Sequence, residues 1–309
     1  MIKEITAEQE TLNSPCLLLG NGINRLFNDS SWKDLISNEL KKSNNSLSYR
    51  EIKQMPATMQ IVAATNGSVG SRMKDMSDEL MNISLSDDRT AFLQEILQMP
   101  ITDILTTNYS FELEIADGMM LSKRQYSAKL RSTFDLKHRH KRFRLFQYYE
   151  TETGKRIWHI HGDAAKPDTM MMGHYYYAKQ LSDLQECIAK SVQRYKICEK
   201  KGEVFQSYSW VDRFLTTDVY ILGLGMYLCE DDLWYLLCCK KKNFPETKVY
   251  FFDKDCSNYE TNIMLRTYGV QIISGSDLSI NESGNTDLYK SFYSSALHYI
   301  RTKIISKSV

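Results

Sequence analysis

The chain has 309 residues, with 39 lysines and arginines against 38 aspartates and glutamates, which gives a formal net charge of +1. Hydrophobic residues make up 42% of it, so it can build a sizeable core, and a mostly disordered chain is excluded. The near-zero net charge excludes an overall field that would hold nucleic acid or an anionic membrane.

Six short apolar runs predict strands buried in a parallel sheet. In chain order they are Cys16–Leu19, Ile101–Thr107, Ile157–His161, Val219–Leu222, Lys248–Phe252 and Val270–Ile273. Sequences typical of helices lie between them, at Ser31–Lys42, Arg89–Met99, Leu181–Lys200, Asp232–Lys241 and Tyr259–Tyr268. We expect Asp87 or Asp88 to cap the second of these helices and Ser257 to cap the last. The alternation predicts an α/β fold with a Rossmann-like parallel sheet.

The uneven spacing of the strands predicts insertions. The first two strands lie roughly eighty residues apart and the next two gaps are about fifty each, whereas a simple crossover needs about 30. We therefore expect helical insertions at about 31–99, 119–154 and 166–215. Because no Pro/Gly/Ser-rich linker separates them, we expect a single domain over 1–309.

The cysteines and the hydropathy pattern indicate the compartment. Seven cysteines include no C-x-x-C pair, which excludes a zinc ribbon built from cysteines. Most lie in apolar runs, where a free cysteine is usually a small buried hydrophobe. The N-terminal residues carry charges where a signal peptide needs an apolar run, and no stretch reaches the ~18 apolar residues of a membrane span. We therefore expect a cytoplasmic protein without a membrane anchor.

Two of the predicted strands run into glycine-containing turns. Gly20–Asn24 follows the first strand and Gly223–Gly225 follows the fourth. Glycines there would let backbone amides approach a phosphate, although they are also typical of an ordinary turn. An acidic step, Glu230–Asp232, leads into the next predicted helix, where Asp232 could hold ribose hydroxyls or only favour the helix N-terminus.

The second predicted strand ends in two threonines and Asn108. They place hydroxyls and an amide at the carboxyl edge of the sheet, where open α/β sheets bind ligands. The alternative is that Asn108 caps a helix over residues 110–117.

The third predicted strand ends in two histidines. The strand period places His159 and His161 on the same face, with only His161 at the carboxyl edge. A histidine there could be a general base or a structural residue. With His174 the two histidines could also bind a metal, but no acidic or cysteine ligand has a suitable spacing, so we expect none.

A dense basic run, 137–144, lies in the second insertion. It could meet the phosphates of a nucleic acid. We favour a solvated helix face or an oligomer contact, and do not expect direct binding of nucleic acid.

Taken in order, these strand ends resemble the sirtuin-like (silent-information-regulator-like) family, which binds NAD in a Rossmann domain that carries helical insertions. The residues that carry the resemblance are Gly20–Asn24 with Trp32, Thr106–Tyr109, His159–Asp163, and Gly223–Gly225 with Asp231–Trp234. They cover the sheet core. The four-cysteine zinc module of deacylase sirtuins is missing, and the motifs look more like the bacterial antiphage-defence branch, whose members hydrolyse NAD.

The resemblance implies a functional pair, Asn108 and His161, with NAD as the substrate and no metal. Asn108 is expected to orient water or a ribose hydroxyl, and His161 to take a proton from it. The turn at Gly20–Asn24 is expected to take the pyrophosphate, and Asp232 to lie near the adenosine ribose. The implied cofactor-binding residues are Gly20, Asn21, Gly22, Asn24, Thr107, Gly223, Gly225 and Asp232. The family often has an acid after Asn-Tyr, where this chain has Ser110.

The resemblance also implies a role and partners. The chain would be an NAD-depleting effector of antiphage defence, assembled as a homo-oligomer or controlled by a separate defence partner such as a motor ATPase. The alternative is a module that binds NAD or ADP-ribose, or a partner, without turnover.

Overall fold

The computed structural model describes residues 14–27, 32–118, 129–132, 145–279 and 288–308. Within them, six strands run parallel to one another: β1 (Cys16–Leu19), β2 (Asp103–Thr106), β5 (Arg156–His159), β6 (Val219–Leu222), β7 (Val249–Phe252) and β8 (Val270–Ile273). Two antiparallel strands, β3 (Lys129–Ser132) and β4 (Gln147–Glu150), extend one edge. The order across the sheet is β3-β4-β5-β2-β1-β6-β7-β8.

The six parallel strands have the order of Rossmann folds. The chain proceeds from β1 through β2 to β5 on one side, and then from β6 through β7 to β8 on the other. The predicted fold class, an α/β Rossmann-like parallel sheet with helical insertions, is confirmed. The order reverses between β1 and β6, and ligands of open α/β sheets bind outside the carboxyl ends of the strands at such a point.

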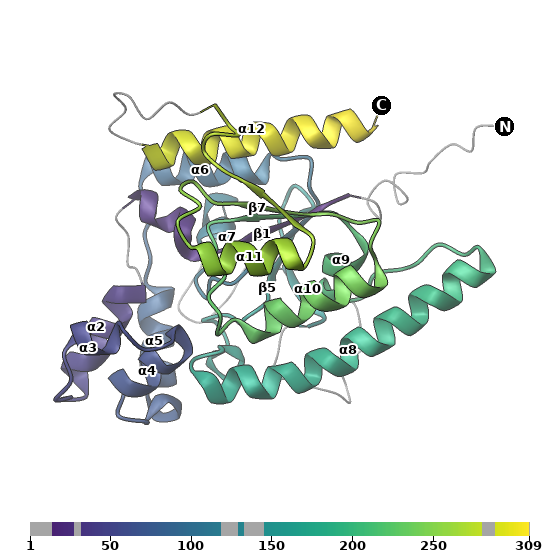
Figure 1. Cartoon of the computed structure of the whole chain (residues 1–309). Coiled ribbons are helices and arrows are strands. Elements are labelled where there is room, and N and C mark those ends of the chain that lie inside the picture. Colours follow the sequence, from purple (N-terminus) through teal and green to yellow (C-terminus); the bar gives the residue numbers. More distant parts are fainter. Residues whose placement is uncertain (1–13, 28–31, 119–128, 133–144, 280–287, 309) are drawn as a thin grey trace.

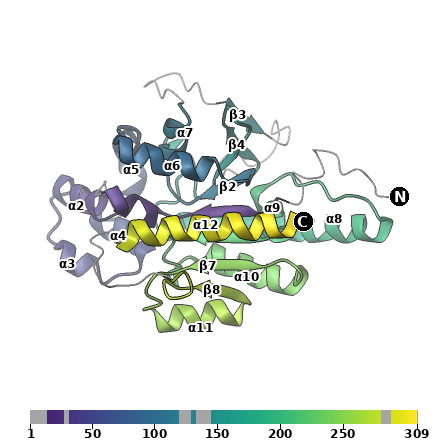
Figure 2. The same cartoon turned by 90° about the horizontal axis from the view of Figure 1, so that it is seen from above.

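Helices cover both faces of the sheet, which explains why its strands are continuous apolar runs (Figures 1 and 2). In β1, Leu17 and Leu19 pack into one core cluster, and Cys16 and Leu18 into the other. The first cluster includes α6 (Asp87–Leu97) and α12 (Leu288–Ser308). The second includes α8 (His174–Lys201), α9 (Trp210–Thr216), α10 (Asp231–Asn243) and α11 (Tyr259–Thr267).

The insertion predicted at 31–99 is helical. Before α6 it contains α2 (Trp32–Lys42), α3 (Tyr49–Ile52), α4 (Ala57–Ala64) and α5 (Val69–Met81). These four helices form a group at one side of the domain (Figure 1). The region 166–215 is also helical and contains the short η2 (Pro167–Thr169) together with α8 and α9.

The insertion predicted at 119–154 is different, because its described residues form β3 and β4 rather than helices. Aromatic side chains explain the strand at β4, since they pack well on a pleated surface. The Tyr148 ring lies 4.8 Å from that of Trp158 in β5, and the Tyr149 ring 5.6 Å from that of His159. The basic run 137–144 lies outside the described residues.

The predicted helix caps are each displaced by one residue. Ser86 caps α6, since its side chain accepts from the Arg89 amide, and Asp87 and Asp88 lie inside the first turn. Asn258, rather than Ser257, caps α11. In both cases a neighbouring polar residue has the extended backbone that a cap requires.

The cysteines are free, but fewer are buried than expected. Only Cys16 and Cys187 are buried, and the other five are partly or fully exposed. Three of the five lie on α10 or just before it, and Cys238 is on the exposed side of this helix. Among the described helices, none combines the length and apolar character that crossing a membrane requires.

A buried ionic network centred on Asp103, at the start of β2, connects the sheet to helix α9. Arg213 of α9 and Arg156 of β5 approach one carboxylate oxygen at 2.7 and 2.6 Å. The Trp158 indole donates to the other oxygen at 2.9 Å. Asp103 and Arg213 are essentially inaccessible to solvent.

We expect Asp103→Ala to lower the free energy of unfolding by about 3–5 kcal/mol, because it removes the carboxylate that compensates the buried charge of Arg213. Urea unfolding followed by circular dichroism measures this. Asp88→Ala, at an exposed position in α6, is the control and should change stability by about 1 kcal/mol or less. A loss of less than about 1 kcal/mol in Asp103→Ala would contradict the assignment.

Candidate active site

A cavity of about 690 Å³ lies at the carboxyl edge of the sheet. Its wall includes residues that follow β1, β2, β5, β6 and β7, together with residues of α2 and α4. Seven of the ten predicted site residues line it: Asn21, Gly22, Thr107, Asn108, His161, Gly223 and Gly225. The other three, Gly20, Asn24 and Asp232, are not part of the wall. The structure therefore brings both members of the predicted functional pair to one cavity.

The glycines after β1 and β6 allow two turns to touch. A Cβ atom on Gly20 would lie 2.5 Å from the carbonyl oxygen of Gly223, and one on Gly22 would lie 2.6 Å from it. The Gly22 amide donates to that same carbonyl at 2.6 Å, and the Gly20 amide donates to Leu222 at 2.9 Å. These two amides are therefore occupied within the protein. We expected them to face a phosphate, and they do not.

Asn24, in the 3₁₀ helix η1 (Asn21–Phe27), supports the wall from behind. Its side-chain amide donates to Asn21 Oδ1 at 2.8 Å and to Glu112 Oε1 at 3.1 Å. Arg89 also contacts Glu112, at 3.2 Å, and Ser110 donates to it. Ser110, which directly follows Asn108-Tyr109, is thus hydrogen-bonded to a carboxylate two residues later in the chain.

The side-chain carbonyl oxygen of Asn108, Oδ1, is buried. It has no hydrogen-bond partner among the described residues. Asn108 does not cap the next helix, because α7 (Glu112–Ala116) begins later and Phe111 at its N-terminus makes no side-chain cap. Leaving a buried polar atom unpaired costs about 1–3 kcal/mol. Such an atom on a cavity wall indicates a place where a ligand or water completes the hydrogen bonding.

His159 fixes the backbone beneath Asn108. Its Nδ1 lies 2.7 Å from the Asn108 carbonyl, and its Nε2 lies 2.9 Å from Glu114 Oε1. Burial is the largest single influence and lowers the pKa of His159, but the charge and hydrogen bond of Glu114, the charge of Asp163 and the Asn108 carbonyl together raise it more, so the net pKa is raised. The protonated imidazole donates to both partners. His159 is therefore a structural residue that positions the neighbouring asparagine.

The prediction that His159 and His161 share one face of a strand is wrong, because His161 lies beyond the end of the strand. Strand β5 ends at His159, and the Gly162 amide donates back to its carbonyl at 3.1 Å. Gly162 has a φ of +84°, and a Cβ there would lie 2.0 Å from the Thr169 carbonyl oxygen. Only glycine fits this turn, which directs His161 toward Tyr177 in the second core cluster.

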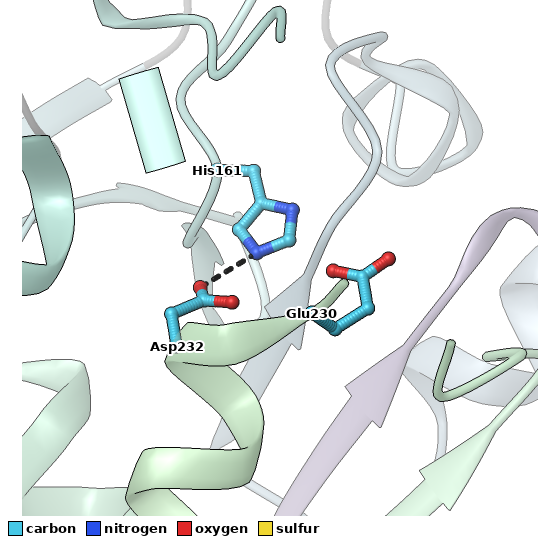
Figure 3. A group of neighbouring side chains, drawn as sticks. All are labelled: His161, Glu230 and Asp232. Carbon is cyan, nitrogen blue, oxygen red and sulfur yellow. Dashed lines mark hydrogen bonds and ion pairs between the residues drawn. The ribbon is translucent and has the colours of Figure 1, made fainter. Parts of the chain in front are cut away.

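His161 is held by a carboxylate from a distant part of the chain (Figure 3). Its Nε2 lies 3.0 Å from Oδ2 of Asp232, which is in the first turn of α10. Burial is the largest single influence and lowers the pKa of His161, but the charge and hydrogen bond of Asp232 and the charge of Glu230 together raise it more, so the net pKa lies above the ordinary 6.5. Asp232 is 1% exposed and lies behind the imidazole. The structure thus gives it a different contact from the ribose contact that we expected.

The other ring nitrogen of His161, Nδ1, makes a longer contact than Nε2 makes with Asp232. Nδ1 lies 3.5 Å from the Tyr177 hydroxyl, and that hydroxyl donates to Glu230 at 3.3 Å. Both distances exceed the usual 2.7–2.8 Å for hydroxyl hydrogen bonds. Because Asp232 retains the proton on Nε2, Nδ1 is the nitrogen that can accept a proton from a ligand.

Glu230 and Tyr177 are candidate site residues that the sequence motifs did not indicate. Both line the cavity beside His161, and Figure 3 shows Glu230 and Asp232 on two sides of the imidazole. Burial raises the pKa of Glu230 to about 7, although the charge of His161 opposes this. The three consecutive acidic residues 230–232 were visible in the sequence. Which of them lines the cavity depends on where α10 begins.

The end of β7 contributes another part of the wall. Asp253, Lys254 and Asn258 line the cavity there, and Tyr289 and Tyr293 of α12 do so as well. Asp253 directly follows a predicted strand, which is the signal that could have identified it. The α12 residues lie in a segment for which we predicted no element.

One group of side chains offers donor atoms that could hold a cation. Ligand atoms of His161, Glu230 and Asp232 all lie within 4.8 Å of one another. His159 and His174 are not part of this group. In the structure, His161 Nε2 hydrogen bonds directly to Asp232, an arrangement that suits a carboxylate-supported base. That the site works without a metal stays a prediction.

We expect Asp232→Asn to lower the pKa of His161, because it removes the carboxylate charge that raises it. A titration of the histidine carbon-bound protons by NMR measures this, with His161→Asn used to assign the signal. The pKa should move down toward or below 6.5. An unchanged titration midpoint in Asp232→Asn would show that Asp232 does not control the imidazole.

No family model and no curated protein matches the chain.

Proposed function

We propose that the chain is an NAD⁺ glycohydrolase that releases nicotinamide and ADP-ribose, and that it acts as an NAD-depleting effector of antiphage defence. The observation that carries this proposal is the meeting of Asn108 and His161 on the wall of one cavity. Asn108 brings a carbonyl oxygen that has no hydrogen-bond partner in the described part of the chain, and His161 brings a nitrogen available for a proton. The choice of NAD as the substrate comes from the resemblance of the sequence motifs to the sirtuin-like family.

The cavity suits a dinucleotide in size and position. Its volume of about 690 Å³ falls within the ~300–1,000 Å³ of small-molecule sites. It spans the strand ends on both sides of the β1–β6 reversal, where Rossmann folds bind nucleotides. The amides of Gly20 and Gly22 are occupied, so the pyrophosphate would be held by other groups of these turns.

Hydrolysis of NAD⁺ breaks the bond between the nicotinamide nitrogen and ribose C1′. The bonding electron pair goes to that nitrogen, which neutralises the pyridinium ring, and positive charge develops on the ribose. A water oxygen then bonds to C1′, and its proton must leave. We assign the orientation of this water, or of a ribose hydroxyl, to Asn108 Oδ1, and acceptance of the proton to His161 Nδ1.

Asp232 supports this step through His161. By accepting from Nε2–H it fixes the tautomer in which Nδ1 is unprotonated, and its charge stabilises the imidazolium that forms. Proton transfer by a group held in this way accelerates a reaction by about 10²–10⁴-fold.

A binding assay with product analysis separates the enzyme from a sensor. Purified protein is incubated with NAD, alone and with candidate defence partners, while calorimetry measures binding and chromatography measures nicotinamide and ADP-ribose. Release of both products supports the proposal. Binding of NAD or ADP-ribose with no nicotinamide released under any condition supports the sensor instead.

A homo-oligomer, a motor ATPase partner and a cytoplasmic location remain expectations.

A further inference from the structure

The end of the cavity beside His161 carries more negative than positive charge. Two carboxylates, Glu230 and Asp232, lie next to a single imidazole (Figure 3). Asp232 is behind the ring and is used to hold it. Glu230 lines the cavity, and its carboxylate accepts from the hydroxyl of Tyr177, which also lines it.

Glu230 differs from Glu112, another acid on the wall. Glu112 forms a buried ion pair with Arg89 and accepts from Asn24, so its charge is compensated within the protein. The interactions found for Glu230 are a hydroxyl at 3.3 Å, from Tyr177, and the charges of His161, Asp232 and Asp231. No lysine or arginine of the described residues forms an ion pair with it.

We propose that Glu230 is a further catalytic residue, whose carboxylate stabilises positive charge at the nicotinamide-riboside end of the substrate. This rests on the proposed function. It makes the site selective for cationic pyridinium glycosides over neutral dihydropyridine ones, that is, for NAD⁺ over NADH.

The positive charge of the substrate moves during the reaction, and in this proposal both of its positions lie near the Glu230 carboxylate. Positive charge is on the pyridinium nitrogen before cleavage and on ribose C1′ and its ring oxygen during it. A fixed carboxylate beside both positions stabilises the transition state electrostatically, and no bond to Glu230 forms. The electron pair of the broken bond still goes to the nicotinamide nitrogen, and the proton of the water still goes to His161.

Burial supports this role because it leaves the carboxylate poorly solvated. It raises the pKa of Glu230 to about 7, so a nearby cation gains more from the ionised form than it would in water. The raised pKa also means that ionised Glu230 costs folding free energy rather than adding to it. We therefore expect Glu230→Gln, which keeps the shape and an oxygen that can accept from Tyr177, to fold as stably as the wild type.

The first experiment compares turnover. Glu230→Gln should lower kcat for NAD⁺ by about 10²-fold or more, as loss of a preorganised transition-state contact does, while ADP-ribose binding stays unchanged. Glu246→Gln, an equal change of charge in the exposed turn before β7, is the matched control and should behave like the wild type. Equal turnover by Glu230→Gln and the wild type would overturn the proposal and leave the NAD⁺ glycohydrolase intact.

The second experiment does not depend on turnover. Calorimetry compares carba-NAD, which keeps the pyridinium charge but resists cleavage, with NADH. The wild type should bind carba-NAD on the order of tenfold more tightly than NADH, and Glu230→Gln should lose this preference. The same preference in both proteins would overturn the role of Glu230. Absence of nicotinamide release by the wild type would instead overturn the proposed function.

Discussion

Replacing His161 by alanine is expected to lower the rate of nicotinamide release by about 10²–10⁴-fold, because it removes the group that accepts the proton. Binding of NAD should change much less, since the imidazole occupies one part of a large wall. Chromatography of nicotinamide over time measures the rate, and thermal unfolding checks that the protein is folded.

The matched control for this change is His174→Ala. His174 is exposed at the start of α8 and belongs neither to the cavity wall nor to the group formed by His161, Glu230 and Asp232. It should release nicotinamide at the wild-type rate. If folded His161→Ala kept the full rate, the assignment of the base would be wrong.

Replacing Asn108 by alanine is expected to remove most of the activity without a comparable loss of stability. Its Oδ1 has no partner among the described residues, so truncation removes an unpaired buried atom rather than a hydrogen bond. The rate of nicotinamide release should fall by about 10²–10³-fold, as when one transition-state hydrogen bond is lost.

A second substitution identifies which atom of Asn108 acts. Asn108→Asp keeps an oxygen at the Oδ1 position but removes the amide donor. Unchanged turnover by the alanine variant would contradict the role of Asn108. Partial recovery in the aspartate variant would identify Oδ1 as the atom that orients the water or ribose hydroxyl.

The strands and the order of the motifs were predictable from the sequence because both depend on local patterns. Strands β1, β6 and β8 have the predicted bounds, since each is an apolar run that ends where a turn begins. A strand buried on both faces leaves this local signal. The positions of Asn108 and His161 at the carboxyl edge follow directly from it.

The partners of the site residues could not be predicted, because they come from distant parts of the chain. Asp232 is 71 residues from His161, and Glu112 is 88 residues from Asn24. Only the three-dimensional fold shows that Asp232 bonds to the imidazole from outside the cavity wall while Glu230 is part of that wall. The face of His161 was also missed, because the turn at Gly162 ends the strand period two residues early.

The most direct test of the central claim is a time course of NAD consumption by the wild-type chain in the presence of EDTA, before and after addition of extract from phage-infected cells. We predict many turnovers per protein molecule, with nicotinamide and ADP-ribose formed in equal amounts. NAD that is bound but remains intact under both conditions would contradict the account.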